Sequence, residues 1–477
     1  MAITPIALGM RSNPGRANAD GAARLINCYA EDAGDEGKIR YPIYACEGFS
    51  SWGSVTSGAN ARALLNFNDT TLYGVSGQRL FRANTAGTVT DMGAFATSGT
   101  VQMVRNRREP NAQIGVVSSD GIFRVIDTTA NTVLTPTIPS GAQFNGIAHV
   151  DGYFILTQAN GEWYVTEIDD GTSIDELDFA RAESNPDGLV VPMSRGNEVI
   201  LFGQRSTEFW QNTGNTDFPF ERSTSQSFGC HAAGTAREIG GTIIFAGTNA
   251  DGAFTGLMML DGYQASKIST PAVDRAILTA TQTNLKAFTY AINGHQFYSI
   301  SGGTAAVFHW TYDLTTGLWH ERASNGLQRW RISEACQFGT RLILGDYTNG
   351  GLYLMSSTVA ASSASVASLS HSDDNGETYI GPRSKTIGGT SNRTQRFRWN
   401  RLGQSKEDGK VFKIEITNAV SENNVGVTMT IIPPHVHSYP YPMRVSALYA
   451  DIVPGSSQNS RPKAITGLAV DTVSVRG

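Results

Sequence analysis

Two histidines of this chain, in the triplet His435-Val436-His437, have the residue type and spacing that come nearest to a metal site. Side chains two positions apart on a β-strand point to the same face, so both imidazoles could bind one transition metal. The triplet lies between prolines, and no third ligand is identifiable nearby. The pattern therefore favours exposed or interface histidines, and we expect no metal and no cofactor.

A second stretch, residues 383–413, is markedly basic and carries two aromatic residues. Arg396 and Arg398 alternate with Phe397 and Trp399, and this period of two is typical of a strand with aromatics on one face and arginines on the other. Three interpretations are open: an interface with an acidic protein patch, which the pattern favours, a solvated face, and a stacking surface for single-stranded nucleic acid.

The segment Ser372-x-Asp374-x-Gly376-x-x-Tyr379 is close to the Asp-box pattern of sialidases. The aspartate of that pattern caps the turn of a β-hairpin, so the motif is mainly a folding device. A glycosidase would also need a nucleophile, an acid/base carboxylate and an arginine cluster in one pocket. No such arrangement stands out, and we expect no catalytic residues and no enzyme activity.

The remaining composition excludes several other classes of protein. No Walker loop, Rossmann glycine fingerprint, nucleophile elbow or HExxH occurs. The net charge is −5, whereas a non-specific nucleic-acid binder usually has a basic excess. The four cysteines are widely spaced, as expected for reduced, buried thiols made in a cytosol. We expect no membrane insertion, because no apolar run approaches the roughly 20 residues of a spanning helix and no signal peptide is evident.

A recurring hairpin pattern supplies the elements that must position any site. Residues 339–356 (GTRLILGDYTNGGLYLMS) place β-favouring residues on both sides of a turn rich in Asp, Asn and Gly. Seven such copies begin between 39 and 53 residues apart, at Leu72, Ile114, Tyr153, Val199, Thr242, His295 and Arg341. A repeat of about 40–50 residues holds one four-stranded blade. We therefore predict an all-β chain with a β-propeller of about seven blades, six and eight remaining possible.

The chain is expected to divide into an N-terminal segment (1–50), the propeller (51–357) and a small C-terminal β-sandwich (358–477). The N-terminal segment could close the propeller by pairing a strand such as Ile43–Cys46 into the last blade. Alternatively, it could lie as an arm on a neighbouring subunit. Both interpretations are open.

Within the C-terminal part, alternating apolar residues predict strands at 396–400, 411–417 and 468–475. Residues 418–463 are rich in proline and predict a long loop inserted before the last strand.

A turn in the middle of the chain, residues 181–188 (RAESNPDG), is predicted to connect two blades. A structural loop is the plainer interpretation, and a loop that contacts a partner is the alternative. The candidate interface residues of the whole chain are Arg181, Glu183, Asp187, Arg393, Arg396, Arg398, Arg401, His435 and His437.

Several blocks resemble the packaged-DNA stabilisation proteins of short-tailed bacteriophages, also called tail hub or nozzle proteins. Residues 181–188 followed by EVILFGQRSTEFW (198–210) resemble the middle of that family. INCYA (26–30) and CEGF (46–49) resemble its entry into the first blade, and RWNRLG (398–403) is similar to its C-terminal sandwich. The likeness is patchy between these blocks.

The resemblance implies a homo-oligomer, expected to be a hexameric ring below the portal and adaptor rings of the virion. The ring would extend the DNA channel, retain the packaged genome and anchor a tail needle, spikes or fibres. Genomic double-stranded DNA would pass through without sequence-specific binding. The protein would be made in the bacterial cytoplasm and end in the tail. The insertion at 418–463 departs from the simplest family pattern and leaves the distal partner open.

Two other functions fit the same pattern. One is a glycan-binding or glycoside-hydrolysing propeller of a phage tail, which as a glycosidase needs a carboxylate pair and an arginine cluster in the central pocket. The other is a generic protein-interaction propeller of bacterial origin. The ring interpretation predicts particles with a central channel.

Overall fold

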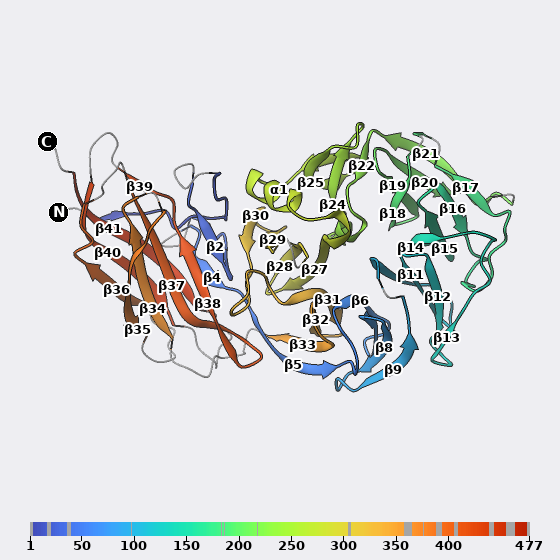
Figure 1. Cartoon of the computed structure of the whole chain (residues 1–477), viewed down its shortest axis with the longest axis horizontal. Coiled ribbons are helices and arrows are strands. Elements are labelled where there is room, and N and C mark those ends of the chain that lie inside the picture. Colours follow the sequence, from blue (N-terminus) through green and yellow to red (C-terminus); the bar gives the residue numbers. More distant parts are fainter. Residues whose placement is uncertain are drawn as a thin grey trace.

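The structure of the chain is a computed structural model that describes residues 3–16, 21–35, 40–96, 98–182, 184–185, 187–216, 218–303, 307–356, 365–374, 376–387, 394–404, 409–437, 443–454 and 463–474. Its regular elements are almost all strands, as predicted, and α1 (Pro271–Leu278) is the α-helix of the described part. Figure 1 shows a round propeller beside an elongated unit of two sheets that contains both termini.

The propeller has seven blades, each a four-stranded antiparallel sheet or a close variant of one. Blade 1 contains β6 (Ala61–Asn66), β7 (Thr71–Ser76), β8 (Arg79–Asn84) and β9 (Val89–Ala94). Blade 2 contains β10 (Val101–Arg105), β11 (Gln113–Ser118), β12 (Ile122–Asp127) and β13 (Thr132–Leu134). Blade 3 contains β14 (Phe144–Val150), β15 (Tyr153–Gln158), β16 (Glu162–Val165) and β17 (Phe179–Arg181). Blade 4 contains β18 (Leu189–Arg195), β19 (Glu198–Gly203), β20 (Thr207–Asn212) and β21 (Phe220–Gln226).

The remaining blades include one divided inner strand and one strand from far away in the sequence. Blade 5 contains β22 (Phe228–Cys230) and β23 (Arg237–Ile239), which both pair with β24 (Thr242–Asn249), followed by β25 (Phe254–Asp261) and β26 (Gln264–Lys267). Blade 6 contains β27 (Lys286–Ile292), β28 (His295–Ser301), β29 (His309–Asp313) and β30 (Leu318–Glu321). Blade 7 contains β31 (Ile332–Phe338), β32 (Arg341–Asp346), β33 (Gly351–Ser356) and β5 (Gly48–Ser54).

The outermost strand of the last blade comes from the N-terminal segment. β5 pairs antiparallel with β33, from Ser54 opposite Gly351 to Gly48 opposite Ser356. The closing strand is therefore β5 and not Ile43–Cys46, the segment suggested by the sequence. Ile43 is instead buried in the other unit, where β4 (Ile43–Ala45) pairs with β41 (Ala464–Ser474).

Apolar side chains fill the spaces between blades. Seven clusters of buried residues each combine strands from two successive blades, including the pair formed by blades 7 and 1. In this last pair, Phe338 and Ile343 of blade 7 pack with Leu72 and Phe81 of blade 1. The ring is thus closed by side-chain packing as well as by β5, because blade 1 covers the open face of blade 7.

The hairpin at residues 339–356 is confirmed, and one buried aspartate organises it. Oδ1 of Asp346 accepts hydrogen bonds from the backbone nitrogens of Thr348 (2.7 Å) and Asn349 (3.3 Å) in the turn. Its Oδ2 accepts from the Tyr353 hydroxyl (2.8 Å) and from Nε of Arg331 (2.8 Å). The turn-rich sequence therefore supplies the bend, and its aspartate links β33 to the residue that precedes β31.

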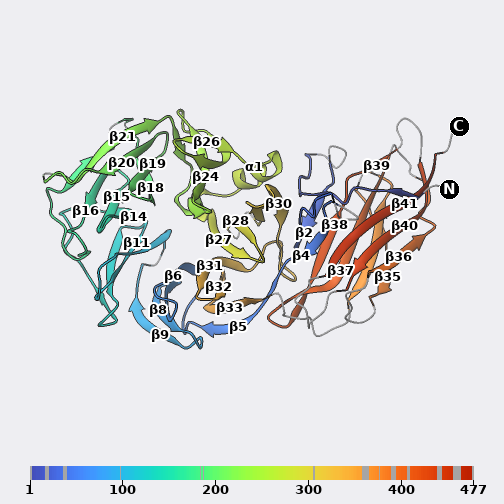
Figure 2. The same ribbon diagram turned by 180° about the vertical axis from the view of Figure 1, so that it is seen from behind.

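The second unit consists of two sheets with one shared apolar core. The first sheet contains β3 (Cys28–Ala30), β4, β41, β40 (Met443–Val453) and β36 (Gln395–Asn400), with β1 (Ile3–Pro5) paired to β41. The second contains β2 (Arg24–Ile26), β38 (Val425–Ile432), β37 (Gly409–Glu422), β34 (Val366–Ser372) and β35 (Ile380–Thr386), with β39 (Val436–His437) paired to β37. Both views show the two sheets side by side (Figure 1, Figure 2).

The prediction of a long proline-rich loop at 418–463 is wrong for much of that segment. β38 and β40 lie within it, and both are central strands of their sheets. The two prolines Pro433 and Pro434 follow the last residue of β38, so they cost no hydrogen bond within the ladder. Pro454 directly follows the last residue of β40. Pro440, Pro442 and Pro462 lie outside the described residues.

The two units meet through buried polar contacts as well as strand pairing. Asn27, with φ of 58°, donates from its side-chain amide to the carbonyl oxygens of Ala323 (2.8 Å) and Thr428 (2.9 Å), one from each unit. The indole of Trp330 donates to Oε1 of Glu422 (2.8 Å). Residues 26–30 (INCYA) therefore connect the propeller to the second unit. Asn27 suits this position because asparagine tolerates the left-handed backbone region.

Candidate functional site

The loop between β17 and β18 is held from inside by the next hairpin. The carboxylate of Asp187 accepts from the backbone nitrogens of Arg205 (2.6 Å) and Ser206 (3.0 Å) and from the Ser206 hydroxyl (2.9 Å). The backbone nitrogen of Ser184 donates to Oε1 of Glu208, a buried residue (2.6 Å). The RAESNPDG and STEFW blocks therefore bind each other and lock the joint between blades 3 and 4.

The other candidate residues of this loop differ in their surroundings. Arg181 lies exposed at the end of β17 and forms an ion pair with Glu162 on β16. Glu183 lies outside the described residues. Exposed ion pairs contribute little to stability, so breaking this one would cost little free energy. The Arg181 side chain is therefore available to a partner protein.

Replacing Asp187 by alanine is expected to lower the free energy of unfolding by about 1–3 kcal/mol, because three donors of the turn lose their acceptor. Urea unfolding followed by circular dichroism measures the change. The matched control is Arg181→Ala in the same loop, with an expected cost below about 1 kcal/mol. Equal costs for the two variants would contradict the structural role of Asp187.

The basic stretch forms strand β36 at the edge of its sheet, with β35 as the edge of the other sheet. Phe397 and Trp399 are buried and stacked with ring centroids 6.1 Å apart, while Arg396 and Arg398 are exposed. The alternation predicted from the sequence is confirmed. The Trp399 indole donates to the carbonyl oxygen of Arg383 on β35 (2.8 Å), so the aromatics of this strand belong to the core.

The exposed basic side chains of these two edge strands are not equally available. Nε and one terminal nitrogen of Arg396 donate to the carboxylate of Asp451 (2.7 and 2.9 Å). The charge of Arg396 is therefore balanced within the chain. The guanidinium of Arg398 lies 5.3 Å from the ring centre of Tyr449. Arg401 is exposed, and Lys385 lies on a strand whose seven residues are all exposed. Arg393 lies outside the described residues.

The histidine triplet is placed by β39, whose backbone pairs with β37 through His437 opposite Gly409. His435 precedes this strand and is half-buried. Within the described part of the chain, no group of three or more His, Cys, Asp or Glu side chains could hold a metal ion.

The Asp-box is a turn in this structure and lies in the C-terminal unit, outside the propeller. Asp374 accepts from the backbone nitrogen of Thr378 (2.8 Å), and the Ser372 hydroxyl donates to Asp374 (2.6 Å). Hydrogen bonds from Ser372 and Thr378 lower the pKa of Asp374. A carboxylate held ionised by its own turn serves folding, as predicted, and it is poorly suited to general acid catalysis.

An acidic loop that the sequence analysis missed joins β16 to β17. Residues 167–178 read EIDDGTSIDELD and contain six carboxylates. Ile168 and Leu177 in the same loop are 60% and 81% exposed. Burial and the charges of Asp175 and Glu167 raise the pKa of Asp178. Six acidic residues among twelve could have identified this loop from the sequence. Together with the two exposed apolar side chains, they give the loop the composition of a contact surface.

The innermost strands of the blades surround a narrow central channel. A cavity of about 260 Å³ in it is lined by residues of β6, β10, β14, β18, β23 and β31. Glu334 in this lining forms ion pairs with Lys286 (3.1 Å) and Arg237 (3.6 Å). A DNA duplex cannot enter such a space, since its major groove alone is about 12 Å wide.

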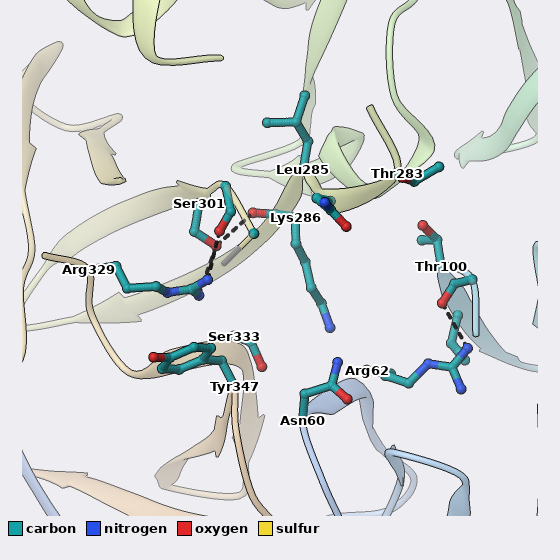
Figure 3. A pocket seen from close by; sticks show the side chains of 15 residues that line it. Asn60, Arg62, Thr100, Thr283, Leu285, Lys286, Ser301, Arg329, Ser333 and Tyr347 are labelled. Carbon is teal, nitrogen blue, oxygen red and sulfur yellow. Dashed lines mark hydrogen bonds between the residues drawn. The ribbon is translucent and has the colours of Figure 1, made fainter. Parts of the chain in front are cut away.

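One mouth of the channel forms a second cavity of about 250 Å³, whose lining includes three cationic side chains and no carboxylate. Figure 3 shows Lys286 and Arg329 extending toward a common space, with Tyr347 beside Arg329 and with Asn60 and Ser333 facing the end of Lys286. These residues come from blades 1, 6 and 7. No sequence pattern joins them, because they are far apart along the chain.

The fold defines the class of the protein: an all-β protein built on a seven-bladed propeller. A family model described as bacteriophage P22 Gp10, β-propeller, matches residues 43–360, and the chain belongs to this family. The match confirms the resemblance to the packaged-DNA stabilisation proteins of phage tails, and the protein is a bacteriophage structural protein.

Other comparisons add only distant likenesses. No curated protein matches the chain. Among solved structures, virginiamycin B lyase from Staphylococcus aureus is 8% identical, with 62% of this chain and 94% of that chain covered and a TM-score of 0.42. The WD40 β-propeller domain of Doa1 is 11% identical, with 65% and 97% covered and a TM-score of 0.38. The designed Ika8 protein is 11% identical, with 64% and 99% covered and a TM-score of 0.39. Among the described residues, no helix combines the length and the apolar composition of a membrane span.

Proposed function

We propose that the protein forms a homohexameric hub or nozzle ring in a short phage tail. The ring extends the DNA channel below the portal and adaptor, retains the packaged genome, and anchors the needle, spikes or fibres. The observation that carries this proposal is the family match over residues 43–360. On this proposal the protein has no catalytic activity, and it ends in the tail after synthesis in the host cytoplasm.

The size of the propeller channel supports a ring of several copies. A cavity of about 260 Å³ excludes duplex DNA from the centre of a single propeller. If DNA passes through this protein, it passes between copies. A net charge of −5 suits such a wall, because few phosphate contacts would hold the DNA back.

The two ends of the molecule suit a head-to-tail contact between neighbours. β36 lies at one end of the long axis and β17 at the other (Figure 1). The first end presents the exposed basic residues of the two edge strands, and the second presents the acidic loop at 167–178. Contacts between two different faces of identical subunits generate closed rings when the rotation permits.

This contact refines the choice of interface residues. Arg398, Lys385 and Arg401 are the basic residues we assign to it, whereas Arg396 is balanced by Asp451. On the acidic side, Asp175 and Glu176 are exposed and directly precede Leu177. Complementary charge contributes register and rate of association more than affinity, and the exposed Leu177 and Ile168 would add apolar area.

Reversing two charges on the basic end, Lys385→Glu with Arg398→Glu, is expected to prevent ring assembly and leave the monomer folded. Like charges would then face each other across the contact. Mass photometry of the protein on its connector measures assembly, and circular dichroism reports the fold.

A charge swap supplies the control for this experiment. Asp175→Lys with Glu176→Lys alone should also prevent assembly, and mixing the two double variants should restore it. The proposed contact would be contradicted if the basic-end variant assembled normally. It would also be contradicted if both variants were folded and their mixture still failed to assemble.

The function itself is tested by phage particles made without the protein. The proposal predicts heads that fill with DNA and then lose it, so that the DNA content of purified particles falls while complementation restores it. Particles that retain DNA at the normal level without the protein would contradict genome retention.

A glycan-directed function remains the alternative to this proposal. It would need sugar-binding or catalytic groups in the propeller, and the Asp-box that suggested it is a turn in the other unit. Release of sugar from host polysaccharide by the purified protein would favour this alternative over the ring.

A further inference from the structure

The mouth of the propeller channel concentrates positive charge in an acidic protein. Arg62 and Arg329 are 6% and 5% exposed, and Lys286 extends between them into the cavity (Figure 3). Lys286 contacts the carboxylate of Glu334, which is shared with Arg237. Among the described residues of the lining there is no acidic side chain.

The three cations differ in how far the protein satisfies them. Both terminal nitrogens of Arg62 donate to carbonyl oxygens, among them those of Gly77 (3.0 Å) and Gly99 (2.8 Å). Arg62 therefore ties blade 1 to the loop before blade 2, and its role is structural.

Arg329 is less fully satisfied. It donates once from each nitrogen, to the carbonyl oxygens of Trp330 (3.1 Å) and Gly302 (2.7 Å) and to the hydroxyl of Ser301 (3.2 Å). A guanidinium has five N–H groups, so donors remain on the side toward the cavity. Its Cζ lies 4.1 Å from the ring centre of Tyr347, and this stacking fixes the direction of the guanidinium.

Lys286 also keeps a donor for the cavity. Its ammonium group donates to the carbonyl oxygen of Ala61 (2.7 Å) and contacts Glu334 (3.1 Å), which leaves one of three N–H groups. Burial lowers the pKa of Lys286 to about 8 and that of Arg329 to about 10. For both groups burial is the main cause, and the nearby carboxylates, Glu334 for Lys286 and Asp346 for Arg329, oppose it only in part.

We propose that this mouth binds a small oxyanion of the phosphate class, between Lys286 and Arg329 and against the amide of Asn60. Buried cations are unfavourable unless an anion balances them, and a tetrahedral oxyanion has acceptors for donors from several directions. The cavity of about 250 Å³ admits inorganic phosphate or the phosphate group of a small molecule.

Such an anion would join three blades at the seam of the ring. Lys286 begins the first strand of blade 6, Arg329 precedes β31 of blade 7, and Asn60 precedes β6 of blade 1. Blade 7 is the one completed by β5. The site therefore strengthens the point at which the propeller closes, whether or not the protein works as a tail ring.

The test is a titration of the full chain with inorganic phosphate at constant ionic strength, observed by the ³¹P line width. We expect saturable broadening with the native protein. Lys286→Gln should weaken binding at least tenfold, and Lys267→Gln on the outer strand β26 is the matched control with no expected effect. Sulfate should compete and chloride should not.

A second variant keeps the test decisive if Lys286→Gln unfolds. Asn60→Asp puts a carboxylate opposite Lys286 at an exposed position, and it should abolish phosphate binding and raise the melting temperature in phosphate-free buffer. Absence of saturable binding to the native protein, or unchanged binding to folded Asn60→Asp, would overturn the proposal.

A nucleoside monophosphate, titrated in parallel, distinguishes the source of the phosphate. Tighter binding than inorganic phosphate supports a phosphorylated small molecule as the natural ligand. Equal or weaker binding supports the free ion.

Discussion

Replacing Arg322 by methionine is expected to lower the free energy of unfolding by about 3–5 kcal/mol. Arg322 is 2% exposed and lies 3.8 Å from the ring centre of Trp330. It donates to the Tyr290 hydroxyl (3.3 Å) and to the carbonyl oxygen of Glu47 (3.1 Å). Methionine keeps most of the volume, so the loss would come mainly from the missing charge and hydrogen bonds.

The charge matters because two carboxyl groups are buried beside it. Burial raises the pKa of Glu47 and of Glu422, and the charge of Arg322 opposes both shifts. Without the guanidinium these groups would have to be protonated or remain buried without a cation. Urea unfolding at pH 7 measures the cost.

The matched control is Arg24→Met, at the same joint between the two units. Arg24 pairs with Glu321, but its side chain is 42% exposed, so we expect a cost of no more than about 1 kcal/mol. If the Arg322 variant lost no more stability than the Arg24 variant, the joint would not depend on a buried charge network.

A second large effect is expected from pH. Burial lowers the pKa of His309 well below its ordinary value and that of His320 to about 3. Below pH 6.5 the unfolded chain binds protons at these positions and the folded chain does not. The free energy of unfolding should therefore decrease as the pH is lowered from 6.5 to about 3. The decrease is up to about 1.4 kcal/mol per pH unit for each histidine.

The surroundings explain why neither imidazole accepts a proton in the folded protein. His309 packs against Trp330 and Phe288, and the charges of Arg329 and Arg322 add to the effect of burial. His320 lies near Arg322 as well. His295 behaves in the opposite way, because its hydrogen bond to Asp313 raises its pKa, and its contribution changes only above pH 6.5.

The prediction is tested by the slope of the free energy of unfolding against pH. Urea unfolding is measured between pH 7 and 5 for the native protein, His309→Gln and His320→Gln. Each variant should lose less stability over this range than the native protein. Comparing slopes removes the cost of the substitution at pH 7. Parallel curves for all three proteins would show that other groups carry the acid sensitivity.

The blades could be predicted because their information is local. A hairpin such as residues 339–356 contains its own turn, its own alternation and the aspartate that caps it. Seven copies at a spacing of 39–53 residues then specify a propeller. The closing strand was not predictable in this way, since both Ile43–Cys46 and Gly48–Ser54 are short and β-favouring. Pairing with β33, 297 or more residues away, decides between them.

The error at 418–463 has a related cause. The prolines of this segment lie after β38 and around β40, whereas the apolar residues inside both strands continue the ladder. A proline after the last residue of a strand leaves the ladder intact, so its position relative to the alternation carries the information and its number does not.

The candidate sites show the same division between local and distant information. The alternation of Arg396 and Arg398 with Phe397 and Trp399 was readable, and the burial pattern confirms it. The partner of Arg396 was not readable, because Asp451 lies 55 residues further on. Lys286 and Arg329 carried no pattern at all, since only the closed ring brings them to one cavity.

The proposed ring of this protein in a phage tail is tested most directly by counting copies on the connector. The purified protein is mixed with the portal and adaptor complex of its phage, and the mass of the product is measured. We expect six copies for each connector and a ring with an open channel in images. A protein that stays monomeric with the connector present, or binds it as a single copy, would contradict the ring.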